Sequence, residues 1–287
     1  MLIEAAVGDA LGAGFEYVSP EIVTEFGDKL EYRAHPKHKQ ITPGKYTDDT
    51  QMSLAIVEAM LDPKEPWTEE SLAERFVSVF KRDERTGYSR RLYGILTSVN
   101  SGTELLATIK GDSDRSGAAM RAFPIGLYSD VGEVIQRCWI QAEITHNTTL
   151  GIQAAEASAL MSHYFAHDVG DKTNLGMFLD RNTGYSEEIG SWGDAYVGKV
   201  GAQGWMSVKA AVTAVMRNDS LAEILKDCIR FTGDVDTVAT IALGCASMSR
   251  QVKQDLPHSL YDGLENGTYG RDYILGLDKR LLDFIGV

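Results

Sequence analysis

The sequence has no long hydrophobic run and no surplus of basic residues. Among its 287 residues, no apolar stretch reaches the roughly 18 residues needed to cross a bilayer. Lys and Arg total 28 against 41 Asp and Glu, which gives a formal net charge of −13. A nucleic-acid clamp or a protein that binds anionic membranes needs basic residues facing phosphates. We therefore expect neither nucleic acid nor a membrane as a partner.

The chain also lacks a secretory signal and a disulfide framework. Glu4 and Asp9 interrupt the first apolar segment, and no basic region precedes it. The cysteines Cys138, Cys228 and Cys245 are an odd number, lie far apart and fall within apolar helical periods, which is typical of reduced core residues. These absences predict a cytoplasmic protein.

Strand signals are scarce as well, because no β-branched run alternates in polarity and ends in a two-residue turn. Apolar residues instead recur at helical spacing. Thr68, Asp130 and Ser220 are candidate N-caps that precede amphipathic segments. The segments 52–61 and 238–248 are apolar nearly all round, so they belong at the centre of a helical bundle. The predicted fold class is all-α.

The chain length fits either one large domain or two. We find no internal repeat, no low-complexity tract and no Pro/Ser-rich hinge, so we predict a single domain over 1–287. The segment 168–204 is long for a structureless connection and is expected to contain short helices or substrate-facing loops. The sequence leaves the oligomeric state open, with a monomer favoured.

Two segments place paired acidic residues at the start of the two most apolar helices. One contains Thr47, Asp48 and Asp49, and the other contains Asp234, Asp236 and Thr237. Helix capping explains one Asp and one Thr in each segment, but not a second carboxylate ahead of a buried helix. Four carboxylates that meet at a bundle centre need cations, and oxygen donors select Mg²⁺, Mn²⁺ or Ca²⁺ over zinc. The pattern indicates a dinuclear metal site, with capping and solvated surface acids as the alternative.

Two further segments are weaker signals by themselves. Gly8-Asp9-Ala10-Leu11-Gly12, followed by Glu16, permits close backbone packing. The polar segment 112–121 offers backbone N–H groups and Ser hydroxyls to a pyrophosphate, or is a surface turn. Elsewhere, His35 and His38 are expected to be solvated in a Pro/Lys-rich loop.

Together these four segments resemble the ADP-ribosylglycohydrolase family, from Gly8 to about Ser249. The most specific motifs are the Thr-Asp-Asp-Thr-x-Met run at 47–52 and the Gly-Asp-x-Asp-Thr run at 233–237. The resemblance implies a compact, multi-helix orthogonal bundle with a binuclear Mg²⁺ or Mn²⁺ centre. It also implies an enzyme that hydrolyses the glycosidic bond between ADP-ribose and a protein or small-molecule acceptor.

The resemblance assigns roles to individual residues. The implied metal ligands are Thr47, Asp48, Asp49, Asp234, Asp236 and Thr237. The implied catalytic residues are Glu16, Asp49 and Asp236, with Glu16 or a carboxylate of the metal set as the base. The implied substrate-binding residues are Ser113, Asp114, Arg115, Ser116, Gly117, Met120 and His146.

Two departures from the family pattern leave the acceptor open. Many members read Gly-Asn-Gly where this chain has Arg115-Ser116-Gly117, and the loop around Asp83 differs from that of the arginine hydrolases. Three aromatic residues are candidates for an adenine platform, namely Tyr185, Tyr196 and Trp205. The alternatives are a non-catalytic binder of ADP-ribose or a nucleotide, and a metal-dependent hydrolase of another nucleoside or phosphate conjugate.

Overall fold

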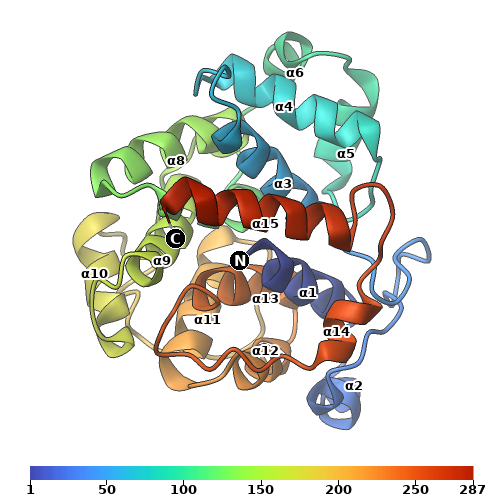
Figure 1. Ribbon diagram of the computed structural model, residues 1–287, viewed down its shortest axis with the longest axis vertical. Helices are drawn as coiled ribbons and strands as arrows, with labels where there is room; N and C mark the ends of the chain where they lie inside the picture. The colour runs from blue at the N-terminus through green and yellow to red at the C-terminus, as the bar shows by residue number, and fades with distance from the viewer. Residues whose placement is uncertain (287) are drawn as a thin grey trace.

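The computed structural model describes residues 1–286, and this part of the chain is built of helices (Figure 1). Residues 1–286 contain isolated β-bridges but no β-strand, so the predicted all-α class is confirmed. The α-helices are α1 (Leu2–Ala13), α2 (Pro20–Phe26), α3 (Asp48–Leu61), α4 (Glu69–Arg82), α5 (Arg90–Ser98), α6 (Gly102–Thr108), α7 (Gly117–Met120), α8 (Val131–His146), α9 (Thr149–Ala166), α10 (Leu175–Asn182), α11 (Gly204–Arg217), α12 (Leu221–Arg230), α13 (Val235–Ala246), α14 (His258–Gly263) and α15 (Arg271–Ile285). The 3-10 helices are η1 (Gly27–Lys29), η2 (Phe123–Leu127) and η3 (Lys172–Asn174).

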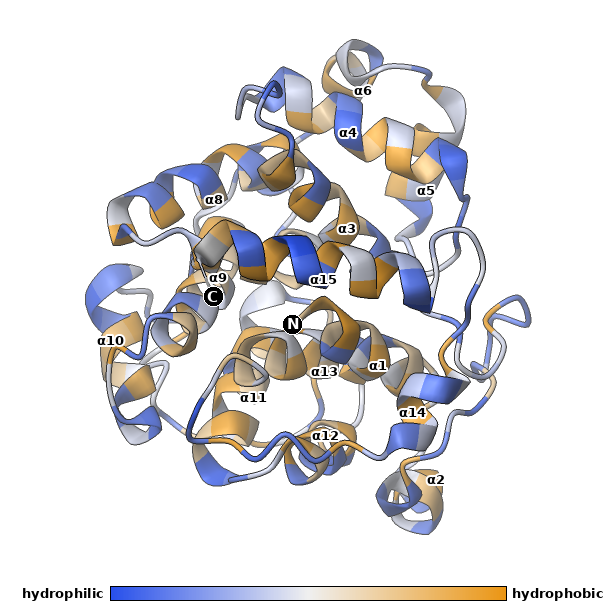
Figure 2. Ribbon diagram, viewed as in Figure 1, coloured by the Kyte–Doolittle hydropathy of each residue, from blue (hydrophilic) through white to orange (hydrophobic). Residues whose placement is uncertain are grey.

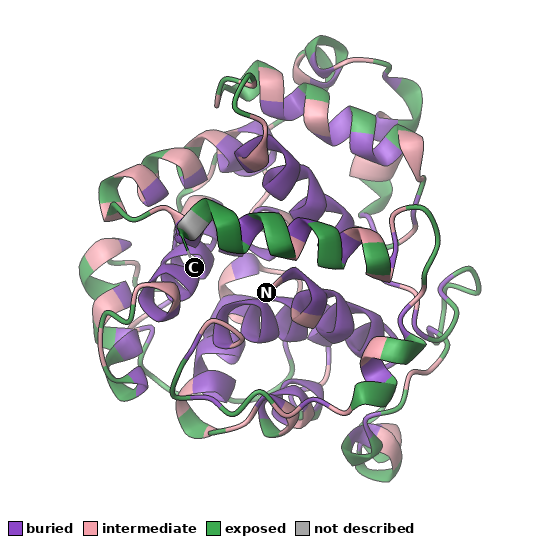
Figure 3. Ribbon diagram, viewed as in Figure 1, coloured by how far each residue is buried: buried purple, intermediate pink, exposed green. Residues whose placement is uncertain are grey.

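The centre of the molecule is the packing of α1 against α13. Both helices are buried along their length, whereas α15, which lies between α1 and α3 in this view, has an exposed outer face (Figure 3). Two glycines allow the close approach, because a Cβ at Gly8 would lie 2.6 Å from the Ala239 carbonyl oxygen and one at Gly12 would lie 2.4 Å from the Asp236 Cα. The small residues of the segment 8–12 thus place the start of α13 against the end of α1.

A third central helix, α9, has no amphipathic pattern in the sequence. It runs for 18 residues and is buried almost throughout, including polar side chains such as Gln153, Ser158 and His163. A helix surrounded by protein on all sides does not need a polar face, so periodicity alone does not identify it.

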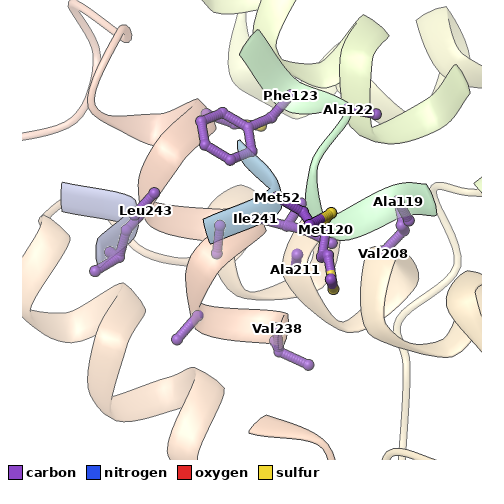
Figure 4. Close-up of a cluster of buried hydrophobic side chains, with 14 of the residues drawn as sticks. Met52, Ala119, Met120, Ala122, Phe123, Val208, Ala211, Val238, Ile241 and Leu243 are labelled. Carbon is purple, nitrogen blue, oxygen red and sulfur yellow. The ribbon is translucent and has the colours of Figure 1, made fainter. Parts of the chain in front are cut away.

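The segment from α7 through η2 passes between the central helices. In Figure 4, Met120 and Phe123 lie among apolar side chains of α3, α11 and α13, including Met52 and Val208. The Phe123 ring lies 2.8 Å from the position of a Cβ at Gly244, which explains the glycine in α13. This anchorage fixes the polar loop that precedes α7.

The predicted helix starts are confirmed by their caps. The side chains of Thr68, Asp130 and Ser220 accept hydrogen bonds from backbone N–H groups in the first turns of α4, α8 and α12. The segment 168–204 contains η3 and α10, so the expected short helices are present. No helix within residues 1–286 is both long enough and apolar enough to cross a bilayer.

The amphipathic helix α15, which alternates apolar and polar residues along its length (Figure 2), covers the start of α1. Its apolar residues Ile274 and Leu277 are buried. Asp278 accepts hydrogen bonds from the N–H groups of Leu2 (2.8 Å) and Ile3 (2.9 Å). A carboxylate at a helix N-terminus satisfies unpaired donors and suits the helix dipole.

We predict that Gly12→Ala destabilises the protein, because the new methyl group would force α1 away from α13. Overpacking of this kind costs about 1–3 kcal/mol of unfolding free energy. The matched control is Gly276→Ala in α15, where no atom lies within 4 Å of the new Cβ. That change should stabilise the helix by up to about 1 kcal/mol. Equal stabilities of the two variants in urea unfolding would contradict the close packing.

Candidate active site

A cavity of about 560 Å³ opens where the N-termini of α3 and α13 meet. This volume is within the roughly 300–1,000 Å³ range of small-molecule sites. The lining includes nearly all of the residues predicted to act in catalysis or to bind metal or substrate: Glu16, Asp48, Asp49, Ser113, Asp114, Arg115, Ser116, Gly117, Met120, His146, Asp234, Asp236 and Thr237. The exception is Thr47. Segments more than 200 residues apart in the sequence therefore form one cavity.

The carboxylates of the cavity are close together and largely buried. Asp49, Asp234 and Asp236 are 4, 9 and 7% exposed. Glu16, Asp234 and Asp236 each offer a carboxylate oxygen, and these oxygens lie within 4.8 Å of one another. Asp49 Oδ1 is buried and has no hydrogen-bond partner. A buried charged oxygen without a partner is costly, so this atom calls for a ligand.

Burial and mutual repulsion raise the pKa values of these groups. Burial raises the pKa of Asp49 and Asp236 well above the ordinary value, and neighbouring carboxylates raise it further. Burial and the charge of Glu16 raise the pKa of Asp234 to about 6. Ionised carboxylates at neutral pH are therefore unfavourable here unless a cation compensates them.

The donor set suits hard divalent cations. The clustered groups are carboxylates, and the nearby hydroxyls of Thr237 and Ser207 hydrogen-bond to Asp234. Oxygen donors of this kind favour Mg²⁺, Mn²⁺ or Ca²⁺, whereas zinc prefers sites with Cys or His. The residues present fit the predicted metal centre.

Asp9 holds the first acidic pair in place. Its fully buried carboxylate accepts hydrogen bonds from the backbone N–H groups of Thr47 (2.9 Å) and Thr50 (3.0 Å), and from the hydroxyls of both residues. The motif at 8–12 thus contributes a carboxylate that fixes the start of α3, in addition to close packing. The Thr47 hydroxyl, predicted to bind metal, donates to Asp9 Oδ1 at 2.8 Å.

His35 positions Glu16, and the expectation that this histidine is solvated is wrong. The His35 side chain is 2% exposed, and its Nδ1 accepts the backbone N–H groups of Lys37 and His38. The ring proton of neutral His35 is therefore on Nε2, which donates to Glu16 Oε2 at 2.5 Å. The loop folds back on itself, which the Pro/Lys-rich composition did not indicate. The expectation holds for His38, which is exposed.

The loop 83–89 contacts the acidic cluster through a glycine. Gly87 has a φ of +123°, and a Cβ there would lie 2.0 Å from Asp48 Oδ1. Asp83 accepts a hydrogen bond from Arg85 Nε at 2.8 Å and is not part of the cavity lining. The loop therefore contacts the acidic cluster through the backbone of Gly87, and not through the side chain of Asp83.

Two residues with left-handed backbones flank the cluster. Tyr17 has a φ of 52° and Thr232 a φ of 62°, and the Tyr17 N–H donates to the Gly233 carbonyl at 2.9 Å. Such strained conformations are rare outside glycine and occur often at functional sites. The hydrogen bond from Tyr17 connects the segment after Glu16 with the residue before Asp234.

Tyr17 also supplies an aromatic ring to the cavity. Among the described residues, the candidate platforms Tyr185, Tyr196 and Trp205 do not line it. Tyr185 is 79% exposed, and the rings of Tyr196 and Trp205 pack against each other with centroids 6.5 Å apart. Tyr17 was missed because it belongs to no motif in the sequence.

The chain belongs to the ADP-ribosylglycohydrolase family, whose family model matches residues 1–286. It is 26% identical to the ADP-ribosylhydrolase ARH3 of Xenopus tropicalis, over 85% of this chain and 84% of that protein. It is 27% identical to the ADP-ribosyl-[dinitrogen reductase] glycohydrolase of Rhodospirillum rubrum, over 83% of this chain and 80% of that protein. The expected family and enzyme class are confirmed.

The fold is shared with a solved structure of an ADP-ribosylglycohydrolase-related protein complex. The two superpose with a TM-score of 0.77 at 20% identity, covering 99% of this chain and 96% of that one. This similarity confirms the predicted bundle.

We predict that the stability of the metal-free protein falls as the pH rises. The pKa of Asp234 is raised from 3.8 to about 6, so the folded chain holds this proton more tightly than the unfolded chain does. The contribution of protonated Asp234 to the free energy of unfolding is complete below about pH 4, and it is lost as the pH rises through about 6. In EDTA, Asp234→Asn should reduce the fall in unfolding free energy by about 2–3 kcal/mol.

The matched control is Asp283→Asn, which alters an exposed carboxylate of α15 and should leave the fall unchanged. With Mg²⁺ present, the fall in the wild type should disappear. Superposable curves in EDTA and in Mg²⁺, measured by urea unfolding from pH 4 to 8, would contradict the assignment.

Proposed function

We propose that the protein hydrolyses the glycosidic bond between C1″ of ADP-ribose and the group attached to it, with the help of two divalent cations, Mg²⁺ or Mn²⁺. The observation that carries this proposal is the meeting of five carboxylates, from the segments around Glu16, Asp48 and Asp234, in one cavity of ligand size. The unpartnered Asp49 Oδ1 supports it, because a buried carboxylate oxygen needs a partner.

The cations would be held by Thr47, Asp48, Asp49, Asp234, Asp236 and Thr237, with Glu16 within reach of Asp234 and Asp236. Bound there, the cations would orient the ribose hydroxyls and lower the pKa of a water molecule. The charge of two divalent cations equals that of the four aspartates, which makes their burial tolerable.

Glu16 is suited to the role of general base. Its carboxylate borders the cavity while the Nε2–H of His35 holds one of its oxygens. The other oxygen is free to accept a proton from the attacking water. Because Glu16 is less buried than the aspartates, it can exchange that proton with solvent.

The polar loop before α7 is suited to the diphosphate. Ser113 and Ser116 bring hydroxyls to the cavity, and the exposed side chain of Arg115 brings a positive charge. Arg90, Arg91 and Lys110 also line the cavity. This positive charge compensates the acidic net charge of the chain at the place where an anionic ligand would bind.

The proposal predicts that EDTA and Asp236→Ala each abolish the release of ADP-ribose from a panel of ADP-ribosylated Arg and Ser conjugates. Loss of a ligand that assembles the site should lower turnover about 100-fold or more. Added Mg²⁺ or Mn²⁺ should restore the EDTA-treated wild type but not the variant. Asp262→Ala, which alters an exposed carboxylate, is the matched control.

Undiminished turnover in EDTA would contradict the metal-dependent mechanism. Tight binding of ADP-ribose without hydrolysis of any conjugate would instead identify the chain as a binder.

A further inference from the structure

A buried arginine lies behind the wall of the cavity and has no role in the mechanism above. Arg121, at the end of α7, is 1% exposed and is not part of the cavity lining. Its Nε donates to the side-chain oxygen of Gln141 at 2.6 Å, and its Nη2 donates to the Gln141 carbonyl and to Thr145 Oγ1, both at 2.9 Å. The guanidinium also lies over the Phe76 ring, 4.5 Å from its centroid. The arginine is thus fixed in place by α4 and α8.

The bond from Arg121 determines where the proton of Thr145 points. A guanidinium has donors only, so Thr145 Oγ1 must act as the acceptor in that bond. The hydroxyl proton is then available to a second partner, and Oγ1 lies 2.6 Å from Nδ1 of His146. Among the described residues, this hydroxyl makes hydrogen bonds with Arg121 and His146 alone. Thr145 therefore donates to Nδ1, and the neutral ring carries its proton on Nε2.

The Nε2 atom of His146 is buried at the wall of the cavity without a protein partner. His146 is 4% exposed and lines the cavity, and its Nε2 is buried and makes no hydrogen bond. A Cβ at Gly117 would lie 3.0 Å from His146 Cε1 and 3.3 Å from Nε2. Gly117, which also lines the cavity, therefore packs against this edge of the ring, where a side chain would collide with it. A buried donor without a partner in the protein points to one in the ligand.

We propose that Arg121 and Thr145 are positioning residues that hold His146 as a neutral imidazole with its proton on Nε2, ready to donate a hydrogen bond to an oxygen of bound ADP-ribose. This proposal rests on the proposed function for the identity of the ligand, but not for the tautomer. It requires an acceptor atom of the ligand at this point of the cavity, and so it disfavours ligands that present an N–H group or a cation there.

The electrostatic surroundings keep the ring neutral. Burial, and to a lesser extent the charge of Arg121, lower the pKa of His146 to about 3. A second positive charge beside Arg121 is unfavourable, so the imidazolium is not populated at neutral pH. The hydrogen bond that one ring nitrogen makes determines the state of the other.

The first test is the tautomer of His146 in the free protein. Long-range proton–nitrogen correlation spectra of ¹⁵N-histidine-labelled wild type at neutral pH should show a neutral ring protonated at Nε2. Thr145→Val removes the donor to Nδ1 with little change in shape and should shift the ring toward the other tautomer. Thr145→Ser keeps the hydroxyl and should restore the wild-type pattern, a rescue that a purely structural role of Thr145 does not predict.

The second test is the affinity for ADP-ribose, measured by calorimetry with Mg²⁺ present. Thr145→Val should raise the Kd about tenfold, and Thr145→Ser should leave it within about twofold of the wild-type value. An Nδ1-protonated or positively charged His146 in the wild type would overturn the proposal, and so would a Thr145→Val variant with unchanged spectrum and affinity. Failure of the wild type to bind ADP-ribose, with the Nε2–H tautomer present, would contradict the proposed function. It would still support the positioning of His146 by Arg121 and Thr145.

Discussion

The burial of like charges is the constraint on which the rest of this structure depends. Asp49, Asp234 and Asp236 lie almost out of contact with solvent, and burial and repulsion raise their pKa values. A protein tolerates such a cluster only if protons or cations compensate it. The fold does not separate these groups, and it positions each one through specific hydrogen bonds and close helix packing. We infer that these carboxylates converge in order to bind cations, and that helix capping alone does not account for their positions.

The contacts that pack the core also set the geometry of the site. Gly8 and Gly12 bring α1 against α13, and Asp9, between them in the sequence, ties α1 to the start of α3. One helix therefore places both acidic segments. The same principle holds on the substrate side, where the apolar anchorage of α7 and η2 fixes the polar loop, and where Arg121 connects that segment to the end of α8.

Much of this could be predicted from the sequence, for identifiable reasons. The caps at Thr68, Asp130 and Ser220 act through bonds within a few residues, so local patterns suffice to find them. The paired aspartates were visible because capping explains one carboxylate at a helix start but not a second one ahead of a buried helix. The roles of His35 and Arg121 were not predictable, because each depends on partners that only the folded chain brings close. Tyr17 was missed because it belongs to no motif, and nothing in the sequence indicated its left-handed backbone conformation.

The number and proximity of the cations that the acidic cluster binds test the proposed metal centre most directly. Metal-free protein can be titrated with Mn²⁺ and followed by electron paramagnetic resonance, which separates free ions from a pair of neighbouring bound ions. We predict that two Mn²⁺ ions per chain are taken up and give the spectrum of a magnetically coupled pair, and that Asp236→Ala abolishes the coupling. Free Mn²⁺ that persists from the first equivalent, or bound ions without coupling, would contradict it.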